Sequence, residues 1–301
     1  MNKKFYKTCK DRAKQLQKEY DHSRKKIYAD YMREFTILEG FIDFSINLGL
    51  SLDSYIPQIE KPALQFALLR IQERSIKIFR EGKILLENGS ASGAMARWRT
   101  LFEFSVVAKM LVKFPDLAVK YIDYAKIDDY KCARKLMEYR EQLNLLDYNM
   151  DDFFDIKAEY EKTMEKYGWI GKDYEWAKNE YVKNPNLFNL SKIVGLEHLY
   201  AYVDEAHKYN HPCMRYLLND RGSKASEDDL QTYLFSPFGI ELPIQLVAIS
   251  LHEINQAVIT GYMQLSSADK DELALYLNRN EDFPSAVLEL IKKRIKSEAP
   301  Q

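Results

Sequence analysis

The sequence has few of the residues that interrupt helices and few that cross-link a chain. Its 301 residues include only 11 glycines and 9 prolines. Apolar residues usually recur at helical spacing, and these facts together predict an all-α protein. The three cysteines, Cys9, Cys132 and Cys213, are widely spaced and form no CxxC pair. We therefore expect neither a disulfide framework nor a zinc ribbon, and a reducing cytoplasm is the simplest interpretation.

The sequence also lacks an excess of charge of one sign and a long uninterrupted apolar run. The net charge is −1, so no overall field attracts nucleic acid. The most hydrophobic windows are 35–50, which contains Glu39 and Asp43, and 242–259, which contains Glu253. Neither has the ~20 apolar residues in a row that a membrane span requires. The N-terminus has no apolar core of a signal peptide, so we expect a soluble cytoplasmic protein without a membrane partner.

The apolar spacing and the turn residues predict a multi-helix bundle. The expected helices cover about 1–28, 29–50, 61–87, 92–112, 116–146, 150–167, 195–210, 243–264, 267–278 and 284–297. Because the linker between 61–87 and 92–112 is short, these two helices should form a central antiparallel hairpin with the others at its periphery. The aromatic-rich segment 168–186 is expected to be an ordered loop with a short helix.

The domain organisation that follows has three sections. Residues 1–58 hold a basic amphipathic helix and a second helix, residues 59–265 form the main helical domain, and residues 266–301 form C-terminal helices. The most disorder-like stretch, 219–230, lies inside the second section, and a further domain boundary, if there is one, is expected near 219–232. We expect the three sections to pack as one compact unit.

The N-terminal helix has two distinct faces. Residues 1–28 carry ten lysines or arginines against three acidic residues. Apolar residues recur on one stripe at steps of three, four or seven, namely Phe5, Cys9, Ala13, Leu16, Tyr20 and Ile27. Two interpretations stay open: a helix that packs on the core with a solvated basic face, or a surface that contacts phosphates or a membrane. An exposed stripe of this kind is also consistent with a homodimer.

Helix 91–111 is the best candidate for a functional centre. Apolar residues occur on every side of it, yet it also carries Arg97, Arg99 and Glu103. A surface pair between Arg99 and Glu103 would contribute only ~0.3–0.5 kcal/mol. We therefore expect each of these two charges to meet a polar group on a neighbouring helix, either in a catalytic site or in a buried polar contact that fixes the helix register.

A second polar cluster lies at 205–212. His207 and His211 share a helix face and are weak candidates for a metal site, since no third ligand is evident. His211 is also a candidate general acid or base, and Tyr209 and Asn210 add a hydroxyl and an amide. The sequence contains no P-loop, no dinucleotide fingerprint and no GxSxG motif. No cofactor is expected.

Several segments resemble domain-of-unknown-function family 5677. They are GAMARWRTLFEF at 93–104, Tyr121 with its helix, YGWIGKDYEWA at 167–177 and YNHP at 209–212. The resemblance covers roughly 60–260 and implies a bacterial, helical protein. It also implies that five residues gather around one polar centre: Arg99, Glu103, Tyr174, Trp176 and His211. The family supplies no settled reaction.

The resemblance leads to competing hypotheses of function. The first is an effector or accessory protein of a phage-defence or toxin-like system that acts on RNA or a nucleotide. In it Arg99, Glu103 and His211 are catalytic, and Arg97, Tyr174, Trp176, Tyr209 and Asn210 bind substrate. The R-x(4–6)-H motif of one ribonuclease superfamily found in defence loci is absent here.

The alternatives assign the same residues differently. In the second hypothesis the protein is a non-enzymatic interaction or scaffold protein, with a partner encoded in the same operon, and the Arg/Glu/His cluster is a structural polar lock. The third, weaker hypothesis is a metal-dependent hydrolase built on His207 and His211.

Overall fold

The computed structural model describes residues 3–59, 62–144, 150–209, 239–265 and 267–298, and these residues form helices and no strand. The all-α prediction is therefore confirmed. The α-helices are α1 (Lys3–Asp30), α2 (Met32–Asp53), α3 (Ala63–Glu87), α4 (Ala91–Lys113), α5 (Leu117–Glu138), α6 (Met150–Tyr167), α7 (Leu187–Ile193), α8 (Tyr200–Lys208), α10 (Glu241–Met263) and α11 (Lys270–Glu298). Short 3₁₀ helices lie at η1 (Ile56–Gln58), η2 (Glu175–Ala177) and η3 (Glu197–Leu199).

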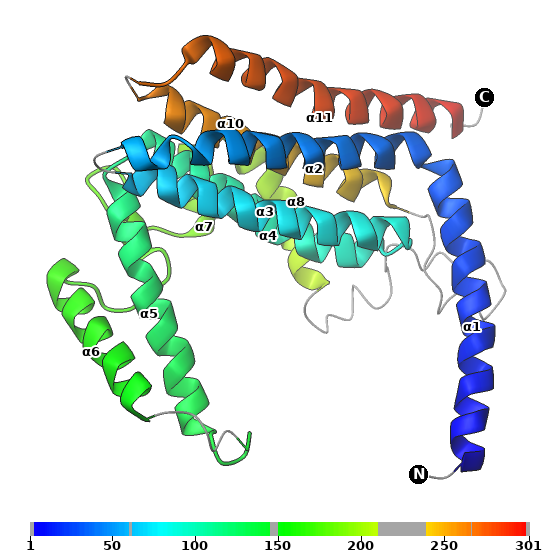
Figure 1. Cartoon of the computed structure of the whole chain (residues 1–301), viewed down its shortest axis with the longest axis horizontal. Helices are drawn as coiled ribbons and strands as arrows, with labels where there is room; N and C mark the ends of the chain where they lie inside the picture. The colour runs from blue at the N-terminus through cyan, green and yellow to red at the C-terminus, as the bar shows by residue number, and fades with distance from the viewer. Residues whose placement is uncertain (1–2, 60–61, 145–149, 210–238, 266, 299–301) are drawn as a thin grey trace.

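Helices α3 and α4 form the predicted central hairpin. The turn between them needs a left-handed residue, which Gly89 supplies with a φ of 75°. The Gly89 amide donates to the Leu86 carbonyl at 2.9 Å, and the Ser90 amide donates to the Leu85 carbonyl at 2.8 Å. These bonds satisfy carbonyls at the end of α3 and return the chain antiparallel along it (Figure 1).

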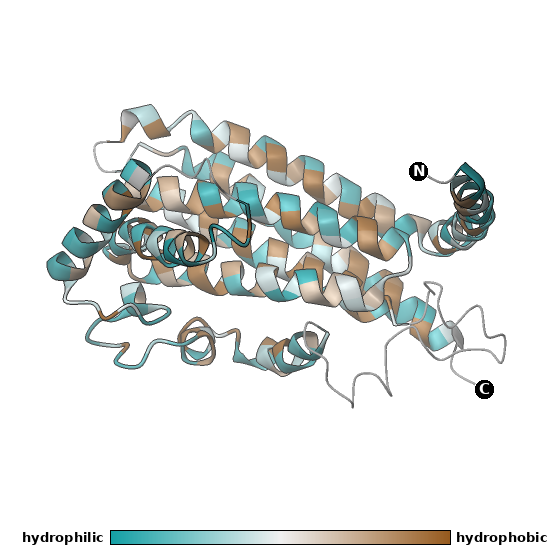
Figure 2. Cartoon of the chain, turned by 90° about the horizontal axis from the view of Figure 1, so that it is seen from below, coloured by the Kyte–Doolittle hydropathy of each residue, from teal (hydrophilic) through white to brown (hydrophobic). Residues whose placement is uncertain are grey.

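Helix α10 shares the centre of the bundle with this hairpin. It packs against α3, α4 and α11, and apolar positions predominate along the helices of the bundle (Figure 2). The Trp98 indole of α4 donates to Ser250 Oγ of α10 at 2.9 Å, with both side chains buried. On the α3 side, Gln65 Nε2 donates to the Gly261 carbonyl at 3.2 Å. The bundle is thus built around α3, α4 and α10 together.

A buried polar network ties four helices of the bundle to one another. Asn255 of α10 donates to Ser45 Oγ of α2 at 2.8 Å and to Asn280 Oδ1 of α11 at 3.2 Å. Gln72 of α3 donates to Asn255 Oδ1 at 2.8 Å. Because each buried polar atom here has a partner, the network costs little desolvation energy and favours one register of the helices.

The C-terminal part corrects the sequence prediction. Two helices were expected at 267–278 and 284–297, whereas the structure has the single helix α11 with Pro284 inside it. Tertiary contacts of the residues just before the proline favour the continuous helix. Phe283 stacks on Phe41 of α2 with ring centroids 4.6 Å apart, and Asn280 belongs to the network above. Packing of this kind can outweigh the lost backbone hydrogen bond of an internal proline.

Two parts of the chain extend from the bundle (Figure 1). Helix α1 leaves it as a single helix, and Ile27 is its buried residue. Helices α5 and α6 pair with each other, and the rings of Tyr130 and Tyr160 stack with centroids 4.1 Å apart. The loop that follows α6 returns to the bundle, where it meets α4 and α5.

Helices α2 and α10 are long and apolar enough, by length and composition, to cross a membrane. Core helices of soluble proteins meet the same criterion. In α10, 67% of the apolar window is buried inside the molecule, against 39% in α2. The cytoplasmic location stays a prediction.

Candidate functional site

Helix α4 is surrounded by other elements, as its all-round apolar character predicts. Met95, Trp98, Leu101 and Phe102 are fully buried. Its charged residues Arg97, Arg99 and Glu103 take half-buried positions instead. The charges therefore lie at the edge of the core, where water and other elements can reach them.

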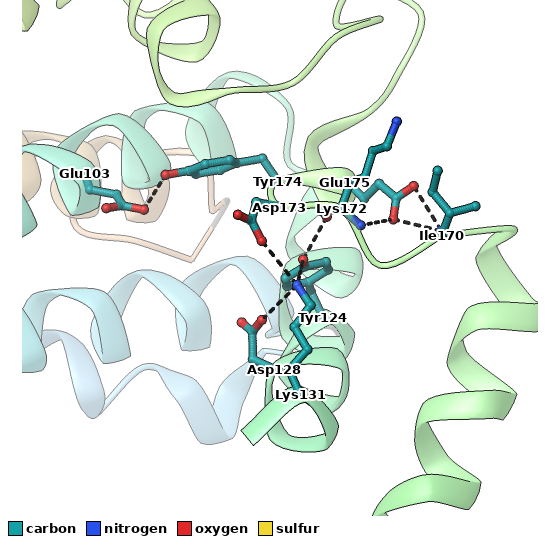
Figure 3. A network of polar contacts seen from close by, with 9 residues as sticks. All are labelled: Glu103, Tyr124, Asp128, Lys131, Ile170, Lys172, Asp173, Tyr174 and Glu175. Atoms are coloured by element: carbon teal, nitrogen blue, oxygen red, sulfur yellow. Dashed lines mark hydrogen bonds and ion pairs between the residues drawn. The ribbon is translucent and has the colours of Figure 1, made fainter. Parts of the chain in front are cut away.

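Glu103 meets Tyr174, which lies far away in the sequence. The Tyr174 hydroxyl donates a short hydrogen bond to the Glu103 carboxylate (Figure 3). Tyr174 is in the loop after α6, and its backbone has the left-handed φ of 60°. This conformation is unfavourable for a residue with a bulky side chain, so surrounding contacts must hold it. Glu103 therefore has a polar partner from a distant segment, as expected, but this partner lies in a loop and not on a neighbouring helix.

The loop that presents Tyr174 is fixed by its own residues. Gly168 and Gly171 adopt left-handed φ values of 63° and 79°, which glycine accepts without a steric cost. The buried Glu175 carboxylate accepts backbone hydrogen bonds from Ile170 at 2.9 Å and from Lys172 at 3.0 Å (Figure 3). Charge-assisted bonds of this kind close the loop into one conformation.

Aromatic side chains press the same loop against α5. Trp176 packs edge-on against Tyr121 with centroids 4.9 Å apart, and Trp169 packs against Tyr124 at 5.5 Å. The Tyr124 hydroxyl donates to the Lys172 carbonyl at 2.8 Å. The prediction of an ordered, aromatic-rich loop with a short helix at 168–186 is confirmed.

A lysine of α5 adds an electrostatic tie to the loop. Lys131 Nζ lies 3.2 Å from Asp173 Oδ1 and 3.2 Å from the Tyr124 hydroxyl (Figure 3). Both contacts raise the pKa of Lys131, although its partial burial opposes this effect. Asp173 is exposed, so we expect the ion pair to contribute little on its own.

The tyrosines beside Glu103 have pKa values above the ordinary tyrosine value. Burial, aided by the negative charges of Glu103 and Asp128, raises the pKa of Tyr121 to about 12. Burial also raises the pKa of Tyr174, and the Glu103 carboxylate raises it further, whereas Arg99 lowers it in part. Both hydroxyls therefore stay protonated at neutral pH and can act as hydrogen-bond donors.

Arg99 has no protein partner in the described part of the chain, so the expectation that it meets a polar group on a neighbouring helix is wrong for these residues. It lies one helical turn before Glu103, the carboxylate that the Tyr174 hydroxyl contacts, and its positive charge opposes the rise in the pKa of Tyr174. Its Nε is buried and makes no hydrogen bond, and within the described residues the guanidinium forms no ion pair with Glu103 or another carboxylate. A guanidinium presents five donors in a planar fork, so this one is available to an external acceptor.

Arg97 takes a different place from the one predicted for it. Its Nε lies 3.0 Å from Glu81 Oε2 of α3, so it forms an ion pair within the central hairpin. Because two residues along a helix are separated by about 200°, Arg97 and Arg99 face different sides of α4. The structure does not bring Arg97 into the group of Arg99, Glu103 and Tyr174.

The predicted histidine cluster is described only in part. His211 and Asn210 lie outside the described residues, so their proximity to Arg99 stays a prediction. Tyr209 follows α8, and its hydroxyl donates to Glu205 at 3.3 Å. His207 is an exposed residue of α8. Among the described residues there is no group of three or more His, Cys, Asp or Glu that could hold a metal.

Helix α8 nevertheless packs on the helix of Arg99. Tyr202 lies edge-on to Trp98 with centroids 6.5 Å apart, and Tyr200 lies edge-on to Phe102 at 6.3 Å, next to η3. The end of α8 that leads toward 210–212 therefore belongs to an element in direct contact with α4.

Sequence reasoning missed the residues that hold the loop, namely Tyr124, Lys131, Asp173 and Glu175. A sequence signal existed for Glu175, because an acidic residue shortly after two glycines is suited to accepting hydrogen bonds from the backbone amides of the turn.

Sequence reasoning also missed two pockets of about 250 and 640 Å³. The smaller lies among Lys109, Ile193, Gln256 and neighbouring residues, and the larger lies between α2 and α3.

The comparisons with known proteins give a family and no activity. No curated protein matches the chain. No solved structure matches it either. The model of a family of unknown function, DUF5677, matches residues 65–225, a range that includes α4, α5, α6 and the Tyr174 loop. With more than half of its length matched, the chain belongs to the DUF5677 family.

Proposed function

We propose that this protein is a bacterial cytoplasmic effector or accessory protein of a phage-defence or toxin-like system, and that it binds RNA or a nucleotide through Arg99. The observation that supports the proposal is the half-buried Arg99 guanidinium, which has an unsatisfied Nε and no carboxylate partner among the described residues. A buried donor without a partner is unfavourable. Nε is the one Arg99 nitrogen that is buried without a partner, so a phosphate group would bind the terminal guanidinium nitrogens, whose planar fork its oxygens match.

The neighbours of Arg99 have positioning roles in this proposal. Glu103 is held by the Tyr174 hydroxyl, so its negative charge is fixed one helical turn from Arg99. Tyr174 and Tyr121 are protonated donors at neutral pH. The ring of Trp176 is covered by Tyr121, so Trp176 supports the loop and Arg99 supplies the contact with substrate.

The test compares the full chain with two arginine variants of the same helix. Wild type is expected to bind a labelled RNA oligonucleotide or nucleoside triphosphate, measured by fluorescence anisotropy. Arg99→Ala is expected to weaken binding about 10- to 100-fold, which corresponds to the loss of a charge-assisted phosphate contact. Arg97→Ala removes an equal charge two residues away, where the ion pair with Glu81 lies, and is expected to retain the affinity.

Equal affinity of the two variants, or no binding by wild type, would contradict the proposal. An RNA-cleavage assay with the same proteins tests whether the protein is also catalytic. If His211 is the predicted general base, His211→Ala abolishes cleavage and leaves binding intact. Loss of both would instead assign His211 to binding.

The hydrogen bond between Tyr174 and Glu103 favours a second candidate. In it the protein is a non-enzymatic interaction protein, and this contact is a structural lock that docks the 168–177 loop on α4. The closed loop and the packed Trp176 support this alternative. The two candidates differ in whether Arg99→Ala changes ligand affinity, and the lock itself is tested at the residue scale below.

A further inference from the structure

Helix α1 is a long arm with almost all of its surface in solvent. Its 28 residues extend from the bundle (Figure 1), and Ile27 near its C-terminal end is its buried residue. The remaining side chains are exposed or, in a few cases, half-buried. The interpretation that this helix packs along the core is therefore wrong for most of its length.

The arm carries a continuous lysine stripe. Six lysines recur at steps of three, four or seven: Lys3, Lys7, Lys10, Lys14, Lys18 and Lys25. They are exposed, and none forms an ion pair with the described part of the chain. With 1.5 Å of rise per residue, the stripe extends over about 33 Å with successive lysines roughly 4.5–10 Å apart.

The arm and the rest of the molecule have opposite charge. Residues 3–30 contain ten basic and four acidic residues, although the whole chain has a net charge of −1. The excess of positive charge is therefore confined to the arm, and the remainder of the chain is acidic. A local field of this kind attracts a polyanion to the arm although the net charge does not.

The position of the stripe decides between two kinds of polyanion. The apolar stripe of Cys9, Leu16 and Tyr20 is centred roughly 140° around the helix from the lysines. A membrane-surface helix buries a face rich in large apolar residues, whereas the exposed part of this stripe has only Phe5, Leu16 and Tyr20 as large members. A nucleic-acid strand needs only one face of the helix, and its phosphates follow a line, as the lysines do.

We propose that the lysine stripe of α1 binds the phosphate backbone of a nucleic-acid strand. This inference rests on the proposed function for the class of ligand, but it concerns a second site that Arg99 does not share. The stripe supplies sequence-independent affinity, and Arg99 supplies one contact within the bundle. The apolar stripe on the other side of α1 stays available to a second copy of the chain.

The test measures how the affinity of the full-length protein for a labelled single-stranded 20-nucleotide RNA depends on salt. If all six lysines neutralise phosphates, log K against log salt is expected to have a slope of about −4. The triple variant Lys7→Gln, Lys10→Gln, Lys14→Gln is expected to reduce the slope by about 2. At 0.1 M salt its affinity should be at least tenfold lower.

The control removes the same charge elsewhere. Lys135→Gln, Lys162→Gln, Lys183→Gln alters three exposed lysines of α5, α6 and the following segment, on the opposite side of the molecule from α1 (Figure 1). This variant is expected to keep both affinity and slope. Equal losses in the two triple variants would overturn the inference, because they would show a general effect of charge.

Two further outcomes separate this inference from the proposed function. If Arg99→Ala weakens binding and the α1 triple variant does not, the inference is overturned and the proposed function is supported. The reverse result supports the inference and contradicts the role of Arg99. Binding of wild type to phosphatidylserine vesicles but not to RNA, lost in the α1 variant, would overturn the inference in favour of a membrane surface.

Discussion

At the scale of single residues, the contact between Tyr174 and Glu103 joins two residues that are each energetically unfavourable in their positions. Tyr174 has an unfavourable left-handed backbone, and Glu103 is a half-buried charged residue on a mostly apolar helix. Their mutual hydrogen bond offsets both costs, since the tyrosine finds an acceptor and the carboxylate finds a donor. The lock is therefore a property of the pair and of the loop that carries Tyr174.

Removal of the Tyr174 hydroxyl tests the lock. Tyr174→Phe keeps the ring and leaves the half-buried Glu103 carboxylate without its donor. We expect a loss of about 1–3 kcal/mol in the free energy of unfolding, seen as a melting temperature lower by about 2–6 °C. Tyr181→Phe removes a hydroxyl from the exposed Tyr181 nearby and should be neutral. The same melting temperature for both variants would rule out a structural lock.

At the scale of helices, the contact between α3 and α10 contains two glycines with different surroundings. A Cβ atom on Gly261 would lie 2.3 Å from Leu68 Cδ1, and Leu68 is fully buried. A Cβ atom on Gly82 would lie 3.6 Å from Val247 Cγ1, which is ordinary contact. The close approach of the two helices therefore requires glycine at 261, whereas at 82 the space also admits a Cβ atom.

The same substitution at the two glycines is expected to have opposite effects. Gly261→Ala should destabilise the protein by about 1–3 kcal/mol, because Leu68 must move within a packed core. Gly82→Ala should be neutral or stabilise it by up to about 1 kcal/mol, because alanine has the higher helix propensity. Urea-induced unfolding measures both. A destabilisation at Gly82 as large as that at Gly261 would contradict this difference between the two sites.

At the scale of the whole molecule, the chain combines a packed bundle with an arm that has unpaired apolar residues. Leu16 and Tyr20 are 44% and 40% exposed, on the same stripe as Cys9. A stripe of this kind on an isolated helix is typical of a surface that another chain covers. A second copy of α1 could cover it and leave both lysine stripes outside.

We expect the protein to be a homodimer through α1. Leu16→Glu places a charge on the stripe and should shift the species to the mass of a monomer, measured by size-exclusion chromatography with light scattering. Leu275→Glu alters another exposed leucine, on α11, which is 60% exposed, and should keep the wild-type mass. A monomeric wild type, or an identical response of the two variants, would contradict the prediction.

The sequence predicted correctly the features that depend on neighbouring residues, and it misled where contacts between distant segments decide the structure. Local spacing and turn residues predicted the helix content, the α3–α4 hairpin and the ordered loop after α6, because neighbouring residues determine these features. Pro284 misled the prediction at α11, since the contacts of Phe283 and Asn280 with distant helices favour a continuous helix. The family resemblance placed Glu103 and Tyr174 in one centre, which the structure confirms.

The sequence by itself determined that this chain is an all-α member of its family with charges on an apolar helix and a basic amphipathic N-terminus. Only the tertiary structure decided what those charges meet. It paired Arg97 with Glu81, joined Glu103 to Tyr174 and left Arg99 without a protein partner among the described residues. The reason is physical: helical periodicity is a local property, whereas the partner of a charge depends on which distant segment packs against that face.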